Sequence, residues 1–254
     1  SAKERTMPVY RRLVNHLQLK KSRLPRLGRL WRQTSVVAFC TLVSRLLGFA
    51  RDIVFASLFG ASPAFDAFLV AFITPNFFRR LFAEGAFSQA FIPVLAQWSK
   101  HEDHFTVHQF ISRIFSNLTV CITVLIALVE CFSPAVVLIF APGFAHDMYR
   151  YHTASALLRV IFPYILLISL TAFFGAILNT YRYFAAPAFA PVLLNVALIL
   201  AALLASRGFS HPIMVVAAGV IVGGFLQLLL QLPTLRKLKL LPRWDVNWRG
   251  PGVS

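Results

Sequence analysis

Six long apolar segments constrain this chain more than any other feature of its sequence. The length of each is close to or above the roughly 20 residues that an α-helix needs to cross the hydrocarbon core of a membrane. They run at approximately 34–60, 64–82, 110–140, 153–180, 186–206 and 212–232. The last two contain no charged side chain. This pattern predicts an all-α integral membrane protein with six transmembrane helices.

The composition also argues against a soluble domain. Of the 254 residues, 58% are hydrophobic and 13% are charged, and the mean hydropathy is +0.70, which leaves too little polar surface to cover a soluble fold. The net charge of +16 lies almost entirely at the chain ends and in short connections. That distribution is typical of membrane topology, so we expect no nucleic-acid partner.

Cysteine and histidine placement gives no sign of a disulfide framework or a metal centre. The three cysteines lie in apolar segments and lack C-x-x-C spacing. His101, His104 and His108 share a helical face, but the charged residues beside them favour an ordinary solvated loop. The sequence has no phosphate-binding or hydrolase motif. We therefore expect no cofactor and no enzymatic activity.

The lysines and arginines predict which side of the membrane each connection faces. With a cytoplasmic N-terminus, six spans place twenty of the twenty-five Lys and Arg residues on the cytoplasmic side, as the positive-inside rule requires. The C-terminus is then cytoplasmic as well. We divide the chain into a basic cytoplasmic tail (1–32), a six-helix transmembrane lobe (33–232) and a basic cytoplasmic connector (233–254).

Three stretches have local features of their own. The tail holds ten Lys and Arg residues and is expected to lie loosely ordered on an anionic membrane face, with one short amphipathic helix near Leu13–Leu19. Residues 83–99 fit an interfacial helix. Pro134 and Pro142 predict a kink in the third segment, which should unwind around Pro142.

Charged residues in the first two segments mark the candidate functional site. An arginine at the centre of a span costs at least ~2.5–3.5 kcal/mol on insertion scales, yet the first segment contains Arg45, Arg51 and Asp52. At about 100° per residue, Arg45 and Asp52 share a face, which should point away from lipid. The second segment and its inner end add Asp66, Asn76, Arg79, Arg80 and Glu84. For Arg80 alone, the positive-inside rule is the favoured explanation.

Two interpretations of these charges are open. In the first, Arg45 pairs with Asp52 or Asp66, and Arg51 reaches the membrane interface. In the second, Arg45, Arg51 and Arg79 outnumber the two carboxylates and hold an anion in a cavity of low dielectric. A diphosphate suits guanidinium groups, because their planar fork donates two parallel hydrogen bonds.

Four single polar residues stand in the other spans: Asn117, Glu130, Asn179 and Asn195. We interpret each as a source of interhelical hydrogen bonds rather than as a ligand-binding group. They should therefore tie neighbouring helices together.

A series of motifs runs through the predicted spans. In chain order they are SRLLGFARD (44–52), DAF (66–68), PN (75–76), RRLFAEGAFSQAFIP (79–93), APGFA (141–145), FPYILLIS (162–169), GAILN (175–179), PAFAP (187–191) and QLP (231–233). Together they resemble the MurJ (MviN) lipid II flippases, within the multidrug/oligosaccharidyl-lipid/polysaccharide exporter superfamily. The resemblance covers roughly residues 35–242, and the motif at 79–93 is highly specific.

The resemblance implies a transporter. In this family, the carrier alternates between inward-open and outward-open states and moves lipid II, the undecaprenyl-diphosphate-linked peptidoglycan precursor, from the inner to the outer leaflet of the bacterial cytoplasmic membrane. No covalent chemistry occurs. The implied partners are lipid II and membrane lipids, and cell-wall synthesis enzymes are further candidates.

The resemblance also assigns roles to the charged residues by position. The arginines that line the cavity and contact the diphosphate are Arg45, Arg51 and Arg79. Asp52 and Asp66 are cavity acids. Asn76 and Glu84 fall in motifs of the inner gate.

The chain is shorter than the family pattern. Members have about fourteen helices arranged mainly in two lobes, so the resemblance implies an N-terminal lobe whose partner is a second lobe. Two other functions remain open at this point: a carrier of another lipid-linked oligosaccharide or a drug, and a non-transporting membrane scaffold for cell-wall enzymes. A scaffold would tolerate charge-neutral changes at the three arginines.

Overall fold

The computed structural model describes residues 7–79, 87–101 and 103–245, and within them the side chains of 31, 34–77, 91–99 and 103–245. Most of the described residues are helical, and none of them forms a strand. In chain order the elements are α1 (Met7–Phe59), α2 (Pro63–Arg79), α3 (Phe87–His101), α4 (His104–Cys131), α5 (Ser133–Phe140), the 3-10 helix η2 (Pro142–His146), α6 (Met148–Ile161), α7 (Tyr164–Thr180), α8 (Ala185–Ala205) and α9 (Pro212–Lys237).

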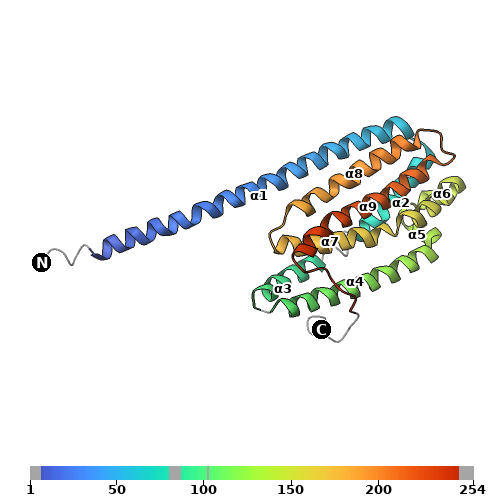
Figure 1. The fold of residues 1–254 in the computed structure, drawn as a ribbon. Coiled ribbons are helices and arrows are strands. Elements are labelled where there is room, and N and C mark those ends of the chain that lie inside the picture. The colour runs from blue at the N-terminus through green and yellow to red at the C-terminus, as the bar shows by residue number, and fades with distance from the viewer. Residues whose placement is uncertain (1–6, 80–86, 102, 246–254) are drawn as a thin grey trace.

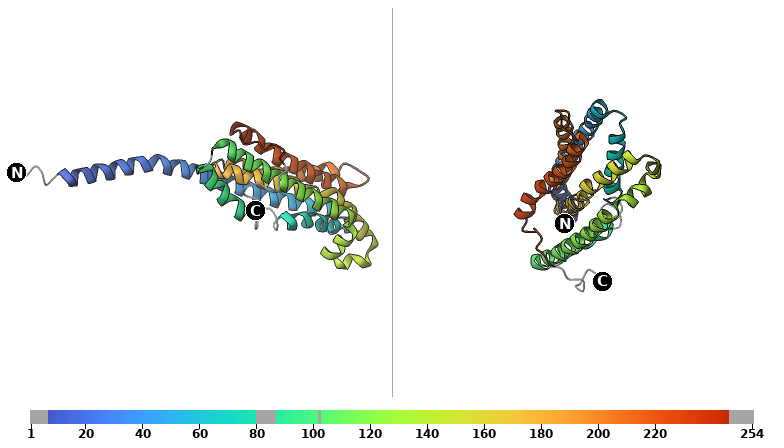
Figure 2. Two further views of the ribbon diagram at one scale, coloured as in Figure 1. Left: turned by 90° about the horizontal axis from the view of Figure 1, so that it is seen from below. Right: turned by 90° about the vertical axis from the view of Figure 1, so that its right-hand side faces the viewer.

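Helix α1 is the longest element and projects from a bundle formed by the others (Figure 1). Its 53 residues correspond to about 80 Å of helix. The C-terminal part packs along α8, and the N-terminal part projects beyond the bundle in Figure 1 and in the left view of Figure 2. We expected residues 1–32 to be loosely ordered, but the helical backbone already begins at Met7. Leucine, arginine and lysine make up about half of this stretch, and all three have high helix propensity.

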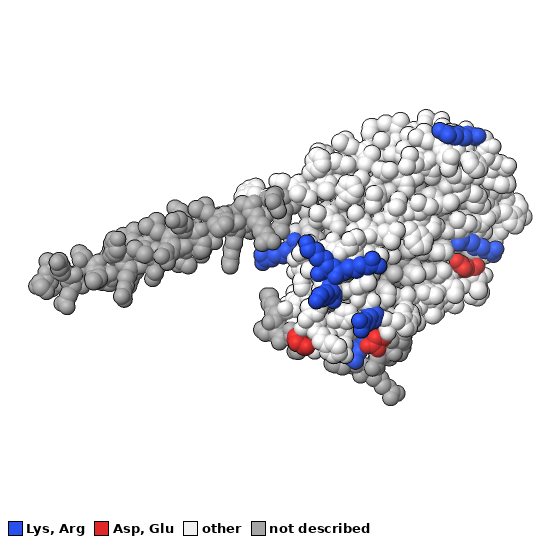
Figure 3. Space-filling model, viewed as in Figure 1, with Lys and Arg blue, Asp and Glu red and all other residues white. Residues whose placement is uncertain are grey.

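Four stretches of the described residues are long and apolar enough to cross a membrane: His104–Cys131, Met148–Thr180, Ala185–Ala205 and Pro212–Lys237. Part of α2, Pro63–Phe77, is apolar but shorter. Lys and Arg side chains gather near the end of α9, whereas a wide band over the middle of the bundle carries none on the face shown (Figure 3). The chain is therefore a multi-pass helical membrane protein. The count of six spans stays a prediction.

Prolines interrupt two of the apolar segments. Helix α4 ends at Cys131, α5 begins at Ser133 with Pro134 in its first turn, and the chain unwinds into η2 after Phe140. The predicted kink and unwinding of the third segment are thus confirmed. The fourth segment also breaks, between α6 and α7 at Phe162–Pro163. We did not predict this break, which arises because proline has no N–H and its ring clashes with the preceding turn.

Helix α7 forms the centre of the bundle. Twelve of its seventeen residues are buried, and it contributes to both hydrophobic clusters of the core. One cluster joins it to α2, α6, α8 and α9, and the other joins it to α3, α4 and the end of α9. Helix α3, where an interfacial helix was predicted, packs the ring of Phe91 against Phe110 and Phe173 with centroids 5.9 and 5.0 Å apart. Its position at a membrane interface stays a prediction.

Glycines let α8 and α9 approach closely. A Cβ at Gly219 would lie 2.4 Å from the Cβ of Ala201, and a Cβ at Gly223 would lie 3.2 Å from the Cα of Leu194. The first distance is far below van der Waals contact, and both atoms are fixed to the backbone of α8. Small residues four positions apart are typical of tightly packed transmembrane helices, because they bring two backbones together.

We expect Gly219→Ala to force α8 and α9 apart and to lower the free energy of unfolding by about 1–3 kcal/mol. Thermal unfolding of the purified chain in detergent micelles measures the effect. Gly143→Ala is the matched control, because a Cβ at Gly143 has nothing within 4 Å. If Gly219→Ala unfolds at the same temperature as the unaltered chain, the close packing of these helices is wrong.

Candidate functional site

Arg51 is held by two side chains. Its Nε and Nη2 donate to Oδ1 of Asp52 over 3.0 and 2.7 Å, and its Nη1 donates to Oδ1 of Asn195 over 3.1 Å. The guanidinium carbon lies 5.9 Å from the ring centroid of Phe55. These bonds use three of the five N–H donors of the guanidinium. The other two have no partner among the described residues and are available to a ligand.

Asn195 ties Arg51 to the middle of α8. It lies ten positions from each end of Ala185–Ala205, which places it at the centre of that candidate span. Its Nδ2 donates to the carbonyl oxygen of Ser44 over 3.0 Å. One amide therefore bridges the backbone of α1 and the Arg51 guanidinium. The prediction that Asn195 makes interhelical hydrogen bonds is confirmed.

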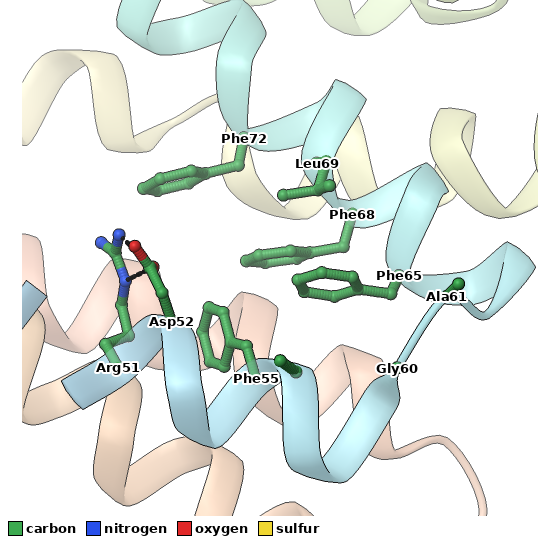
Figure 4. A pocket seen from close by; sticks show the side chains of 10 residues that line it. Arg51, Asp52, Phe55, Gly60, Ala61, Phe65, Phe68, Leu69 and Phe72 are labelled. Carbon is green, nitrogen blue, oxygen red and sulfur yellow. Dashed lines mark hydrogen bonds and ion pairs between the residues drawn. The ribbon is translucent and has the colours of Figure 1, made fainter. Parts of the chain in front are cut away.

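A cavity of about 630 Å³ opens between α1 and α2 beside this arginine (Figure 4). Arg51 and Asp52 lie at one end of it. The rest of the wall is apolar or aromatic and consists of Phe55, Ala56, Gly60, Ala61, Phe65, Phe68, Leu69 and Phe72. Figure 4 shows the three phenylalanine rings of α2 pointing toward α1. A wall of this kind keeps the local dielectric low, which strengthens the field of the charged end.

Arg45 and Asp52 lie on one exposed face of α1. Arg45 is exposed, the Asp52 side chain is 64% exposed, and Phe49 between them is 67% exposed. Within the described part of the chain, Arg45 has no ion pair or hydrogen bond. Charges are costly against hydrocarbon, so this face is poorly suited to contact lipid.

Asp66 lies apart from these arginines, in the first turn of α2. It accepts hydrogen bonds from Nε and Nη2 of Arg150 over 3.2 and 3.0 Å. Arg150 also forms an ion pair with Asp147. The Asp147 carboxylate caps α6 by accepting from the backbone amide of Arg150 over 3.0 Å. This cluster joins the start of α2 to the start of α6.

The first interpretation of the charges is therefore wrong about their pairing. Arg45 pairs with neither Asp52 nor Asp66, because Arg51 takes the first carboxylate and Arg150 takes the second. Arg51 is also hydrogen-bonded to the central residue of α8. The sequence indicated two carboxylates near the α1 arginines, Asp52 and Asp66, but only Asp52 pairs with one of them.

The remaining site residues follow on α2. Asn76 donates from Nδ2 to the carbonyl of Phe72 over 2.8 Å, so its amide is engaged within its own helix. Arg79 is the last residue of α2, and its side chain lies outside the described residues. Arg80 and Glu84 also lie outside the described residues.

Sequence reasoning missed some residues and misplaced others. Nothing local marks Arg150 as the partner of an aspartate 84 positions away. His104 and His108 belong to the first turns of α4 and contact the segment after α9, so a purely solvated loop is wrong for them. Asn117 keeps a buried amide with no partner among the described residues, against our expectation of an interhelical bond. No three His, Cys, Asp or Glu residues of the described ranges gather as a metal site.

Comparison with known proteins decides the family. The family model described as lipid II flippase MurJ matches residues 55–254. The chain belongs to the MurJ family. The probable lipid II flippase MurJ of Buchnera aphidicola subsp. Acyrthosiphon pisum is 43% identical over 217 residues, which are 85% of this chain and 42% of that protein. The lipid II flippase MurJ of Burkholderia cenocepacia is 42% identical over 229 residues, covering 89% of this chain and 44% of that protein.

A solved structure of lipid II flippase MurJ in an inward closed conformation superposes with a TM-score of 0.70 at 27% identity. The superposed region covers 84% of this chain and 44% of the solved chain. This likeness confirms the predicted family and fold class. The chain spans less than half the length of these MurJ relatives and corresponds to roughly their N-terminal half.

We expect Asn195→Ala to lower the free energy of unfolding by about 1–3 kcal/mol, because it leaves a carbonyl and a charged group inside the bundle without their partner. Thermal unfolding in detergent measures the change. Asn179→Ala is the control, since the Asn179 side chain is exposed and makes no hydrogen bond among the described residues. Equal stability of the two variants would contradict a linking role for Asn195.

Acid should loosen the junction of α2 and α6. The backbone amide of Arg150 and then its guanidinium lower the pKa of Asp147 below the ordinary value. The stabilisation is therefore present above the ordinary aspartate pKa of about 3.9 and is lost as the pH falls through the lowered pKa. We expect the unfolding temperature of the unaltered chain to fall more steeply below about pH 4 than that of Asp147→Asn. Parallel curves would exclude this contribution.

Proposed function

We propose that this chain forms the substrate-binding half of a lipid II flippase in the bacterial cytoplasmic membrane. The observation that supports this most directly is the placement of Arg51. Its guanidinium is anchored beside the centre of α8, at the end of a cavity, with two N–H donors free among the described residues. The substrate class is proposed from the relatives, whose names specify lipid II.

The charges on α1 suit a diphosphate. Arg45 and Arg51 share only Asp52 as a nearby carboxylate, because Asp66 is bound to Arg150. Uncompensated positive charge is strongly unfavourable at low dielectric, so an anion that enters this region is stabilised. A diphosphate offers several adjacent oxygens, which match the parallel donors of a guanidinium. By its family position, Arg79 is proposed as a third contact.

Asp52 then acts as the resident counter-ion of Arg51. It holds Arg51 through one oxygen, while its side chain is 64% exposed on the open face of α1. An incoming diphosphate competes for the guanidinium, and Asp52 moves aside. When the substrate leaves, Asp52 restores the ion pair. This exchange keeps Arg51 neutralised throughout and prevents the arginine from holding its substrate too tightly to release it.

Transport itself requires a second half. Alternating access proceeds by rocking two repeats around a site near the membrane midplane, and we place the second half against the exposed face of α1, because Arg45 and Asp52 cannot face lipid. Both basic ends are assigned to the cytoplasm. The residues proposed to act at the inner gate are Asn76, Arg80 and Glu84. Asp66 is proposed as a gating residue at the opposite end of α2. Membrane lipids and cell-wall synthesis enzymes complete the proposed partners, and we assign no covalent chemistry or cofactor.

We expect Arg51→Ala to weaken binding of lipid II about 10- to 100-fold, as loss of one charged hydrogen-bonding partner predicts. Binding is measured on the complete gene product in nanodiscs. Cells that depend on this variant alone are expected not to grow, although the protein still inserts into the membrane. Arg207→Ala is the control, because Arg207 is an exposed arginine in the connection between α8 and α9.

Normal growth on Arg51→Ala would overturn the proposal and would favour a scaffold without transport. Unchanged affinity for lipid II together with lost affinity for another lipid-linked sugar would instead favour a different substrate. Arg51→Lys separates charge from geometry, since lysine keeps the charge and loses the planar fork.

A further inference from the structure

The chain reverses at the end of α9 and returns along α4. Lys239 has a φ of 56°, in the left-handed region. The amide of Leu240 donates to the carbonyl of Leu235, and that of Lys239 donates to the carbonyl of Arg236, both over 3.0 Å. These two bonds form a Schellman motif. Leu235 and Leu240 are both fully buried in the cluster shared with α3, α4 and α7, so the direction of the returning chain is fixed.

A stripe of polar side chains on α4 receives the returning chain. Its members follow one another at intervals of four residues and therefore lie on one face of the helix. They are His104, His108, Ser112 and Ser116, and their partners are the Leu238 carbonyl at 3.2 Å, the Leu241 carbonyl at 2.8 Å, the Arg243 amide at 3.0 Å and the Asp245 amide at 2.8 Å. Residue numbers rise together in the two lists. The segments therefore run side by side in the same direction.

The dimensions of the two segments fit this register. The twelve positions from His104 to Ser116 rise about 18 Å along a helix. The seven positions from Leu238 to Asp245 span at most about 25 Å when extended. The returning chain, which begins with the turn at Lys239, is therefore long enough to meet one polar residue per turn of α4.

The bonds are directed mainly at backbone atoms. A carbonyl only accepts, so each histidine Nε2 must carry the proton in these contacts. Ser112 uses both functions of its hydroxyl, donating to the His108 carbonyl over 2.8 Å and accepting from the Arg243 amide. An ion pair between Arg113 Nε and Asp245 Oδ2, at 3.3 Å, closes the far end. Ser112 and Ser116 are 3% and 0% exposed, so the returning chain satisfies polar groups that would otherwise be buried alone.

We propose that residues 238–245, here called the strap, are a docked coupling element and not a free linker. The polar stripe of α4 is its binding groove, and the Arg113–Asp245 ion pair is its latch. The strap locks α4 to α9 and holds the chain at Asp245 to a fixed point on the bundle. Movement of a segment or domain that is attached at Asp245 is then transmitted to α4 and α9. This role is separate from the anion site and does not rest on the proposed function.

Hydrogen exchange on the whole chain in nanodiscs, without substrate, tests the proposal directly. Pro242 has no amide, so a short peptide covering residues 242–245 reports chiefly on the strap. We expect its amides to exchange at least about 100-fold more slowly than in an unstructured peptide. In Ser112→Ala/Ser116→Ala this protection should fall at least about tenfold, with α7 unchanged. Ser99→Ala is the matched control, because the Ser99 hydroxyl donates only to Ala96 in its own helix.

A second variant keeps the test decisive if the double variant disturbs the fold. Asp245→Asn removes only the latch at the exposed end, and we expect trypsin to cleave after Arg243 several-fold faster than in the unaltered chain. Exchange in the unaltered strap as fast as in an unstructured peptide would overturn the proposal. Full protection in the double variant, or unchanged cleavage in Asp245→Asn, would show that these polar contacts do not hold the strap. No arm measures transport, so failure here is distinct from failure of the flippase assignment.

Discussion

An arginine in the middle of a membrane span needs polar partners within the protein. Inserting a lone guanidinium at that depth costs at least ~2.5–3.5 kcal/mol. Arg51 obtains one partner from the next residue and another from the centre of α8. The second contact fixes the rotation and depth of α1 against α8, because Asn195 also grips the Ser44 carbonyl. Helix α8 is in turn seated closely on α9 by Gly219 and Gly223. The position of the Arg51 guanidinium is thereby fixed relative to both α8 and α9.

The start of α2 and the exposed face of α1 show how the structure distributes its few carboxylates. At the first turn of α2, Asp66 and Asp147 converge on Arg150, so each of these charged groups has an opposite charge beside it and the junction acts as a structural joint. Along α1, Asp52 serves Arg51, and Arg45 has no partner among the described residues. The paired charges thus lie at the joint of α2 and α6, whereas the positive surplus lies on the exposed face of α1. Removing Asp66 from the site makes the α1 surface more attractive to anions than the sequence alone indicated.

The sequence predicted what depends on local pattern. Apolar length identified the four long apolar stretches among the described residues, and Pro134 and Pro142 located the interruption of the third predicted segment. A helical angle placed Arg45 and Asp52 on one face. Contacts between distant residues could not be derived this way. Nothing in the periodicity pairs Asp66 with Arg150, and nothing near His108 signals the strap more than 130 residues later. The continuous α1 was missed because basic residues were interpreted as a tail, although their helix propensity is high.

The Arg51–Asp52 ion pair has a consequence for biogenesis. Its members are adjacent in the chain, so the pair forms as soon as α1 is helical and needs no other helix. Asn195 is 144 residues further on, and at the usual rate of synthesis its arrival takes roughly 7–30 s. During that interval Asp52 supplies the counter-charge of Arg51 before any contact with α8 exists. Arg45 has no such neighbour, and no described residue of the later helices pairs with it.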